Sequence, residues 1–218
     1  MSALILTLLA LQAPLDEGTF LLRQDTAEIG REAFRLAAGR GGGGWTLSST
    51  VRFDRSRPIV VLNPILEIGA DSLPASLDFS VADPREPLRI LGQRSRGRFT
   101  VRLLGRLTER AREFPAPAPV VLLDDSVFVL YLAAAWHAGP SPVSVTAIFP
   151  RAGHREVLVV QDLGVEATTL HRDPASLRHV TVTGGPNQLV HLWLDRAGRL
   201  LRVAVPSRRL TAERAPAS

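Results

Sequence analysis

Apolar and polar residues alternate along short segments through most of the chain. The alternation is cleanest where Trp45, Leu47, Val51 and Phe53 are separated by polar residues, and it recurs over 75–81. A period of two sends successive side chains to opposite faces of an extended strand. Gly, Pro and Asp residues separate the segments, as in turns between paired strands. The pattern therefore predicts a meander of about eight strands before residue 125 and about six after residue 137.

Residues 125–137 depart from this rhythm, because they are apolar almost without interruption. Asp125 begins the run as a helix N-cap would, and Gly139 and Pro140 follow it as stop signals. The segment predicts one helix from Asp125 to His137, roughly 20 Å long and too short to span a bilayer. Such a helix must be covered on several sides. The predicted fold is therefore mainly β, with a large curved antiparallel sheet, an open or half barrel, wrapped around one central apolar helix.

The ends of the chain differ from the strand-rich part. Residues 3–11 are apolar and end near small residues where a signal peptidase could cut, although no Lys or Arg precedes them. We therefore expect a signal peptide at 1–13 and an exported, periplasmic protein; the alternative is a buried N-terminal strand or helix. Residues 14–209 are expected to form a single β-rich domain, and residues 210–218 a flexible tail.

Particular residues also predict strand order and register. Pro64 interrupts an apolar segment and cannot donate a ladder hydrogen bond, so that segment is expected to be an edge or bulged strand. Near the C-terminus, a turn centred on Gly185 would set Val180 opposite Val190. The other face of these last strands then carries histidine, tryptophan and arginine side chains.

His179 and His191 are candidates for chemistry, because the same register places them directly opposite each other. Facing histidines on adjacent strands can share a metal ion. Two ligands do not complete a site, and a third would have to come from His171, His154 or Asp195, none of which stands at a spacing typical of a metal motif. We favour two exposed cross-strand histidines, and predict no metal site.

Asp124 and Asp125 form an adjacent acidic pair, which can perform acid–base chemistry when burial separates the two pKa values. A helix N-terminus stabilises negative charge, however, so helix capping is the simpler explanation. No nucleophile elbow, zinc-protease, Walker or dinucleotide motif occurs in the sequence. We therefore predict no catalytic residue and no cofactor.

Composition narrows the classes of partner. The chain has no cysteine, which excludes disulfides, thiolate metal sites and a cysteine nucleophile. All 26 basic residues are Arg and outnumber 21 acidic residues, so the formal charge is +5. This balance favours anionic surfaces. The aromatic residues share strand faces with Leu and Val rather than with Arg, so nucleic-acid binding is not expected.

The interior of the predicted half barrel is a candidate binding site. Residues 133–135 are all alanine and leave space beside the predicted helix. A curved sheet with such space can hold an acyl chain or a similar apolar ligand. The residues expected to line this cavity are Trp45, Phe79, Tyr131 and Trp136.

Three stretches resemble uncharacterised exported bacterial proteins with an open, half-barrel sheet. They are Gly18-Thr19-Phe20 with Glu28-Ile29-Gly30, Leu123-Asp124-Asp125, and residues 192–203. Those proteins are similar in shape to the lipoprotein carriers of the periplasm and to other lipid-binding half barrels. The resemblance covers most of 18–209 and implies a fold, but it carries over no catalytic residue.

Three functions from different classes remain. The leading hypothesis is a non-enzymatic exported protein that binds a lipid or another apolar ligand between the sheet and the helix. The second is a protein-interaction module of the cell envelope, with a solid core and exposed strand edges that include the segment of Pro64. The third is a metal-assisted hydrolase that uses His179 and His191.

Overall fold

The computed structural model describes residues 15–39 and 43–216, so the signal peptide expected at 1–13 lies outside the described residues. No helix in this part of the chain combines the length and the hydropathy that crossing a membrane requires. The elements, in chain order, are β1 (Asp16–Gln24), β2 (Ala27–Ala38), β3 (Trp45–Phe53), β4 (Val61–Ile68), β5 (Pro74–Ala82), β6 (Leu88–Ser95), β7 (Arg98–Leu104), β8 (Glu109–Pro115), β9 (Val120–Leu122), α1 (Tyr131–Ala135), β10 (Val143–Phe149), β11 (His154–Leu170), β12 (Asp173–Thr183), β13 (Leu189–Leu194), β14 (Leu200–Val205), the 3-10 helix η1 (Pro206–Arg208) and β15 (Leu210–Arg214).

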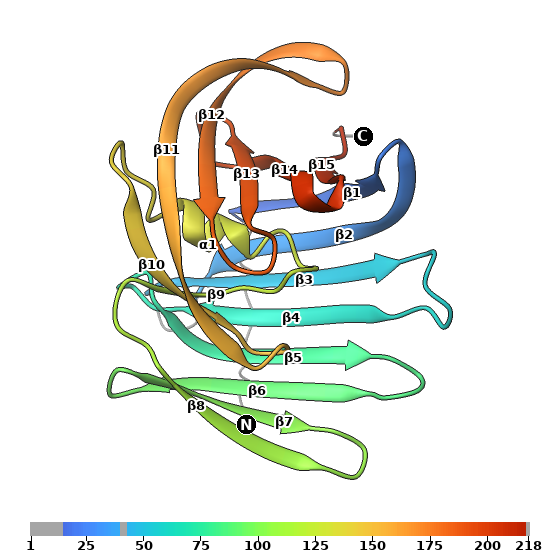
Figure 1. Cartoon of the computed structure of the whole chain (residues 1–218), viewed down its shortest axis with the longest axis vertical. Helices are drawn as coiled ribbons and strands as arrows, with labels where there is room; N and C mark the ends of the chain where they lie inside the picture. Colours follow the sequence, from blue (N-terminus) through green and yellow to red (C-terminus); the bar gives the residue numbers. More distant parts are fainter. Residues whose placement is uncertain (1–14, 40–42, 217–218) are drawn as a thin grey trace, which may run out of the picture.

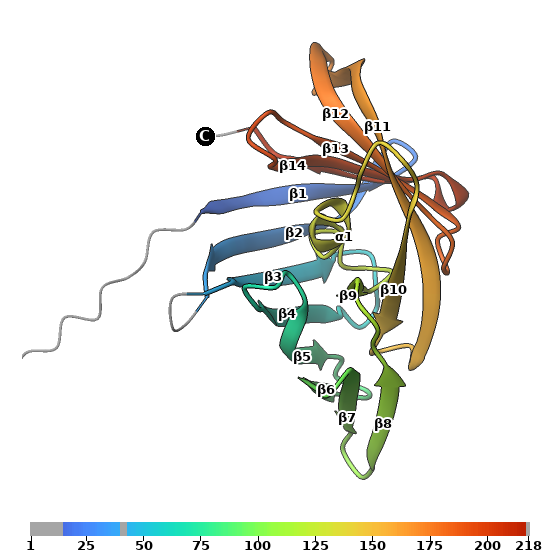
Figure 2. The same ribbon diagram turned by 90° about the vertical axis from the view of Figure 1, so that its left-hand side faces the viewer.

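All the strands belong to one 15-stranded sheet in the order β8-β7-β6-β5-β4-β3-β2-β1-β15-β14-β13-β12-β11-β10-β9 (Figure 1). The ladder between β9 and β10 is parallel, whereas the other ladders are antiparallel. The sheet curls without closing, because β8 and β9 remain its two edges. Figure 2 shows β2 and β3 on one side of α1 and β10 and β11 on the other. The mainly β class and the open sheet are thus confirmed, although the sheet is mixed.

The predicted central helix from Asp125 to His137 is wrong. Only Tyr131–Ala135 is α-helical, and the N–H of Tyr131 donates to the carbonyl of Phe128, three residues back. Ahead of the helix, Asp124 forms an isolated antiparallel bridge with Val127. The continuous apolar run therefore indicated burial correctly but not conformation, since a buried irregular segment and a buried helix share the same composition.

The segment 123–138, in the connection from β9 to β10, forms an inner layer against the concave face of the sheet. Residues 120–124 and 127–135 are all buried. Side chains from both halves of the sheet join them in one hydrophobic core, including Phe20 and Phe79 from one half and Leu192 and Val203 from the other. Each fully buried side chain of this size contributes roughly 1.5–3 kcal/mol. The inner layer therefore fills most of the concavity of the sheet, where the sequence predicted that a ligand would bind.

Pro64 does not mark an edge strand, because β4 lies between β3 and β5. Pro64 pairs with Phe79 of β5, while the ladder from β3 passes from the pair Ser48–Ile65 to the pair Val51–Leu62 without a pair at Pro64. The missing N–H thus coincides with a gap in the β3–β4 ladder. Proline can stand in an interior strand at such a gap, because no backbone N–H is needed there to donate a hydrogen bond to the neighbouring strand.

The C-terminal region predicted as a flexible tail from residue 210 begins with β15. This strand lies between β1 and β14, and its Leu210 and Ala212 are buried in the core. Arg214 donates two hydrogen bonds to the Asp16 carboxylate, at 2.7 and 3.0 Å. Leu210–Arg214 is therefore part of the domain.

The register of β12 and β13 differs from the prediction by two residues. Val182, rather than Val180, lies opposite Val190, and His179 lies opposite Trp193. The loop that joins the strands contains two glycines with positive φ and spans 184–188, one residue further along the chain than the predicted turn at 183–187. Because side chains alternate with a period of two, an even shift keeps every side chain on its predicted face.

Candidate ligand-binding cleft

A cleft of about 370 Å³ opens where the start of β1, the β2–β3 connection and the β13–β14 turn meet the end of α1. The rings of Trp45 and Trp136 lie 5.2 Å apart, centroid to centroid, and both side chains are half-buried. Leu36, Leu132 and Leu194 complete the apolar wall. Volumes of ~300–1,000 Å³ with mostly apolar linings are typical of small-molecule sites. On the inner side of the sheet, the described residues thus leave room for a ligand beside Trp45 and Trp136, the two tryptophans that were predicted to line a cavity.

Charged side chains form the rim of the cleft, and each has an internal partner. Arg178 Nε donates to Asp162 Oδ2 at 2.7 Å, and Arg199 Nε donates to Asp195 Oδ2 at 2.7 Å. Asp16 accepts two hydrogen bonds from the guanidinium group of Arg214 in β15. These charge-assisted bonds fix the side chains and balance the charge locally. The rim is therefore polar without a large excess charge, which suits the polar end of an amphiphilic molecule.

The other two residues expected to line a cavity, Phe79 and Tyr131, lie in the packed core instead. Their exposed fractions are 1% and 2%. Tyr131 accepts a hydrogen bond from Asn187 Nδ2 at 3.0 Å, and burial raises its pKa to about 12. Between β4 and β9 the core has no space for a water-sized molecule. The structure thus brings Trp45 and Trp136 together and places the other two elsewhere.

A buried carboxylate that the sequence analysis missed holds the inner layer in place. Glu32 of β2 is 0% exposed, and its Oε1 accepts hydrogen bonds from Ser49 Oγ at 2.8 Å and from the N–H of Val129 at 3.2 Å. Its Oε2 accepts the N–H of Phe128 at 2.9 Å. Burial raises the pKa of Glu32 from 4.5 to about 7, although these hydrogen bonds oppose the rise. The sequence did contain an indication of this burial, because the period of two places Glu32 on the same apolar strand face as Phe34.

Asp124 and Asp125 do not cap a helix, because the N-cap of α1 is Leu130 and has no side-chain hydrogen bond. Both aspartates bind Arg151 instead: its guanidinium contacts the two oxygens of Asp124 at 2.7 Å each and Asp125 Oδ1 at 2.6 Å. Burial raises the pKa of Asp124, and the hydrogen bonds from Arg151 act in the opposite direction. Asp124 also accepts the N–H of Ser126. The pair is a structural ion cluster at the start of the inner layer.

His179 and His191 meet, as the sequence predicted, but on diagonal rather than opposite positions. His179 Nε2 lies 2.9 Å from His191 Nδ1, so one ring donates to the other. His179 Nδ1 lies 3.1 Å from Glu166 Oε2, and its ring stacks on Trp193 at 4.9 Å. His179 is buried, at 7% exposed, contrary to the expectation of two exposed rings.

The histidine pair does not extend into a metal centre. In the described parts of the chain, no three His, Asp or Glu side chains are placed to hold a metal ion. The candidate third ligands have other partners, which are Glu156 for His154, Glu213 for His171 and Arg199 for Asp195. The geometry thus gives the metal-assisted hydrolase hypothesis no support.

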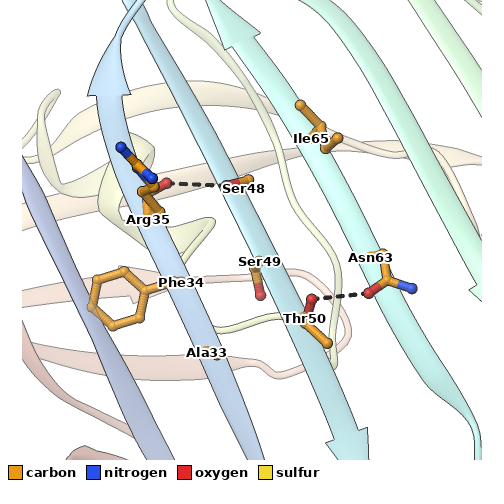
Figure 3. Close-up of a pocket in the computed structure, with 8 residues that line it drawn as sticks. All are labelled: Ala33, Phe34, Arg35, Ser48, Ser49, Thr50, Asn63 and Ile65. Carbon is orange, nitrogen blue, oxygen red and sulfur yellow. Dashed lines mark hydrogen bonds between the residues drawn. The ribbon is translucent and has the colours of Figure 1, made fainter. Parts of the chain in front are cut away.

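The outer face of β2, β3 and β4 has a shallow depression of about 310 Å³ (Figure 3). Its side chains are mostly small, and Thr50 Oγ1 donates to Asn63 Oδ1 at 3.0 Å across the gap in the β3–β4 ladder. Two large apolar side chains line it, Ile65, which is 45% exposed, and Phe34, which is buried. The depression lacks the facing tryptophans of the cleft, so the cleft is the stronger candidate site.

No protein-family model matches the sequence, and no curated protein matches it. A solved structure that resembles the fold is the beta-barrel-like protein of a domain of unknown function, DUF1849, from Brucella abortus. The match has a TM-score of 0.52 and 11% sequence identity, and it covers 91% of this chain and 95% of that chain. At this identity the likeness shows the fold alone, an open β-rich sheet, and it gives no link to lipoprotein carriers.

Proposed function

We propose that this protein is a non-enzymatic binder of an apolar or amphiphilic small molecule, such as a lipid chain. The observation that carries the proposal is the pair of half-buried tryptophans, Trp45 and Trp136, facing one cleft in an otherwise packed inner face. Large aromatic side chains supply much of the binding energy in apolar sites. Export to the periplasm is part of the same proposal and rests on the apolar residues 3–11.

The position of the cleft limits what the ligand can be. Because the inner layer fills the concavity, a ligand reaches only the end of the half barrel and not its whole length. An acyl tail or a compact ring would contact Leu36, Leu132 and Leu194, and its polar end would lie near Arg178 and Arg199 at the rim. A site of this form binds part of an amphiphile and leaves the rest in solvent.

The test is calorimetric titration of the full chain with decanoate and with decanol, which share a tail and differ in charge. Removing one tryptophan ring from the contact, in Trp45→Ala, is expected to weaken binding by about tenfold or more. Trp193→Phe is the matched control, because Trp193 lies on the other face of the sheet beside His179. If neither ligand gives saturable binding, or if Trp45→Ala binds as tightly as the Trp193 variant, the proposal is wrong.

The second candidate, an interaction module of the envelope, is favoured by one observation. Val157 and Val159 of β11 lie on one face of the strand and are 62% and 38% exposed, next to a solid core. Exposed apolar strand surface is a feature of protein contacts. Val157→Asp should abolish such a contact and leave decanoate binding unchanged, so the two functions can be separated.

A further inference from the structure

A second and larger cleft, of about 770 Å³, lies at the opposite end of β1 from the candidate ligand site. The long β11–β12 hairpin arches over β13, β14 and β15 (Figure 1), and the N–H of His171 at its tip donates to the Glu213 carboxylate of β15 at 3.3 Å. The tip, the β1–β2 turn and the outer faces of β14 and β15 enclose the cleft. Its titratable side chains are Arg23, Asp25, His171, Arg172, Arg202 and Glu213.

The acidic side chains of this cleft already have partners. Glu213 Oε1 lies 3.0 Å from His171 Nδ1 and 3.9 Å from Arg23 Nη1. Asp25 Oδ1 lies 3.4 Å from Arg209 Nη1, outside the cleft lining. The two carboxylates are therefore largely neutralised by these neighbours.

Two arginines keep unused donors. Among residues 15–39 and 43–216, Arg172 makes neither a hydrogen bond nor an ion pair. Arg202 Nη1 donates only to the Thr169 carbonyl, at 3.4 Å, and its Nε is buried without an acceptor. The guanidinium of Arg202 also lies 4.9 Å from the centroid of the Trp193 ring, which fixes its position. The cleft thus combines positive charge with donors that the protein itself leaves unsatisfied.

We propose that this cleft binds a phosphate group. Three guanidinium groups from β1, β14 and the hairpin tip, with the hydroxyls of Thr26, Thr169 and Thr211, offer donors from several directions. A tetrahedral anion uses such an arrangement better than a planar carboxylate, and arginine forks match phosphate oxygens in pairs. The volume exceeds that of the anion, so the phosphate belongs to a larger molecule, either a soluble phosphomonoester or a phospholipid headgroup.

The hairpin tip provides a matched pair of variants. Arg172 has a φ of 76° and stands in a turn, and Asn accepts this left-handed conformation, so Arg172→Asn removes the charge without straining the backbone. Arg96, in the β6–β7 turn, is also exposed and has a φ of 46°. Arg96→Asn therefore removes the same charge in the same backbone conformation, far from the cleft.

The experiment is a titration of the full chain with inorganic phosphate at low ionic strength. Binding is measured by calorimetry and by the width of the 31P NMR line. Acetate, a planar anion, is added as a competitor. We expect phosphate to bind, acetate not to compete, and Arg172→Asn to weaken binding about tenfold while Arg96→Asn binds as the parent does. Equal weakening in both variants, competition by acetate, or no phosphate binding would each overturn the proposal.

A sedimentation assay distinguishes the two sources of the phosphate. Vesicles of phosphatidylcholine with and without phosphatidic acid are mixed with the protein. Sedimentation with the phosphatidic acid vesicles that inorganic phosphate reverses and Arg172→Asn prevents identifies a headgroup site. Phosphate binding without sedimentation identifies a soluble ligand. Sedimentation that Arg172→Asn and Arg96→Asn reduce equally reports only the net charge, and contradicts the proposal.

Discussion

Replacing Glu32 with glutamine should change how the stability of the protein depends on pH. The carboxylate is fully buried and accepts three hydrogen bonds, and burial raises its pKa from 4.5 to about 7. Glu32→Gln keeps the shape of the side chain and removes the ionisation. The amide NH2 meets backbone N–H donors, so the substitution also has a cost in stability that does not change with pH.

The size and sign of the effect follow from the two pKa values. An unfolded chain releases the Glu32 proton near pH 4.5, whereas the native protein holds it until about pH 7. Between these values the native state binds more protons, so its stability falls as the pH rises. A difference of one in pKa is worth ~1.36 kcal/mol, so the free energy of unfolding falls by about 3 kcal/mol across this interval and is constant above it.

The assay is urea unfolding of the parent and of Glu32→Gln, followed by tryptophan fluorescence, at pH values from about 4 to 8. Other titrating groups are common to both proteins and cancel in the difference. We expect the variant to gain about 3 kcal/mol relative to the parent across the range. Glu86→Gln, in an exposed turn, controls for the general loss of a negative charge. A parent-minus-Glu32→Gln difference that stays constant with pH would refute the reasoning.

Three further outcomes are expected. Arg151→Met should lower the free energy of unfolding by about 3–5 kcal/mol in urea, because it leaves a buried aspartate without its partner. A chain that ends at Arg209 should give no cooperative unfolding transition by circular dichroism, whereas one that ends at Arg214 should unfold as the parent does, since β15 lies between β1 and β14. Burial and the adjacent His179 hold the pKa of His191 below 6.5, so NMR titration of His179→Gln should show a higher His191 pKa than the parent.

Strand faces could be predicted from the sequence because the alternation of side chains does not depend on register. The two-residue shift between β12 and β13 left the apolar side chains inside and still brought His179 within 2.9 Å of His191. The turn residues set the register itself. Gly184 and Gly185 both have positive φ, and the sequence did not show that the loop would begin at residue 184 rather than at residue 183.

The features that the sequence did not reveal depend on contacts between distant residues. The N–H of Phe128 donates to Glu32, 96 residues away, so the conformation of the apolar run was decided outside it. Likewise β15 forms because β1 and β14 accept it from both sides. Trp45 and Phe79 gave the same signal, yet one lines a cleft and the other lies in the core, because residue type alone does not distinguish the two environments.

The two edges of the sheet, β8 and β9, follow each other in sequence, and β1 and β15 pair in its middle. Reading the sheet from β9 to β15 and then from β1 to β8 makes every strand a neighbour of the next. A circular permutant that joins the present ends of the domain near Ala215 and Asp16, and opens the chain at Pro117, would therefore pair its strands through local hairpins, apart from the step through the inner layer. The native chain must instead bring β1 and β15 together across almost its whole length, which is a high contact order. We therefore expect the permutant to reach the same structure and to fold faster than the native chain. The arrangement of the strands in the sheet is the same in both, so the difference in rate would come from their order along the chain.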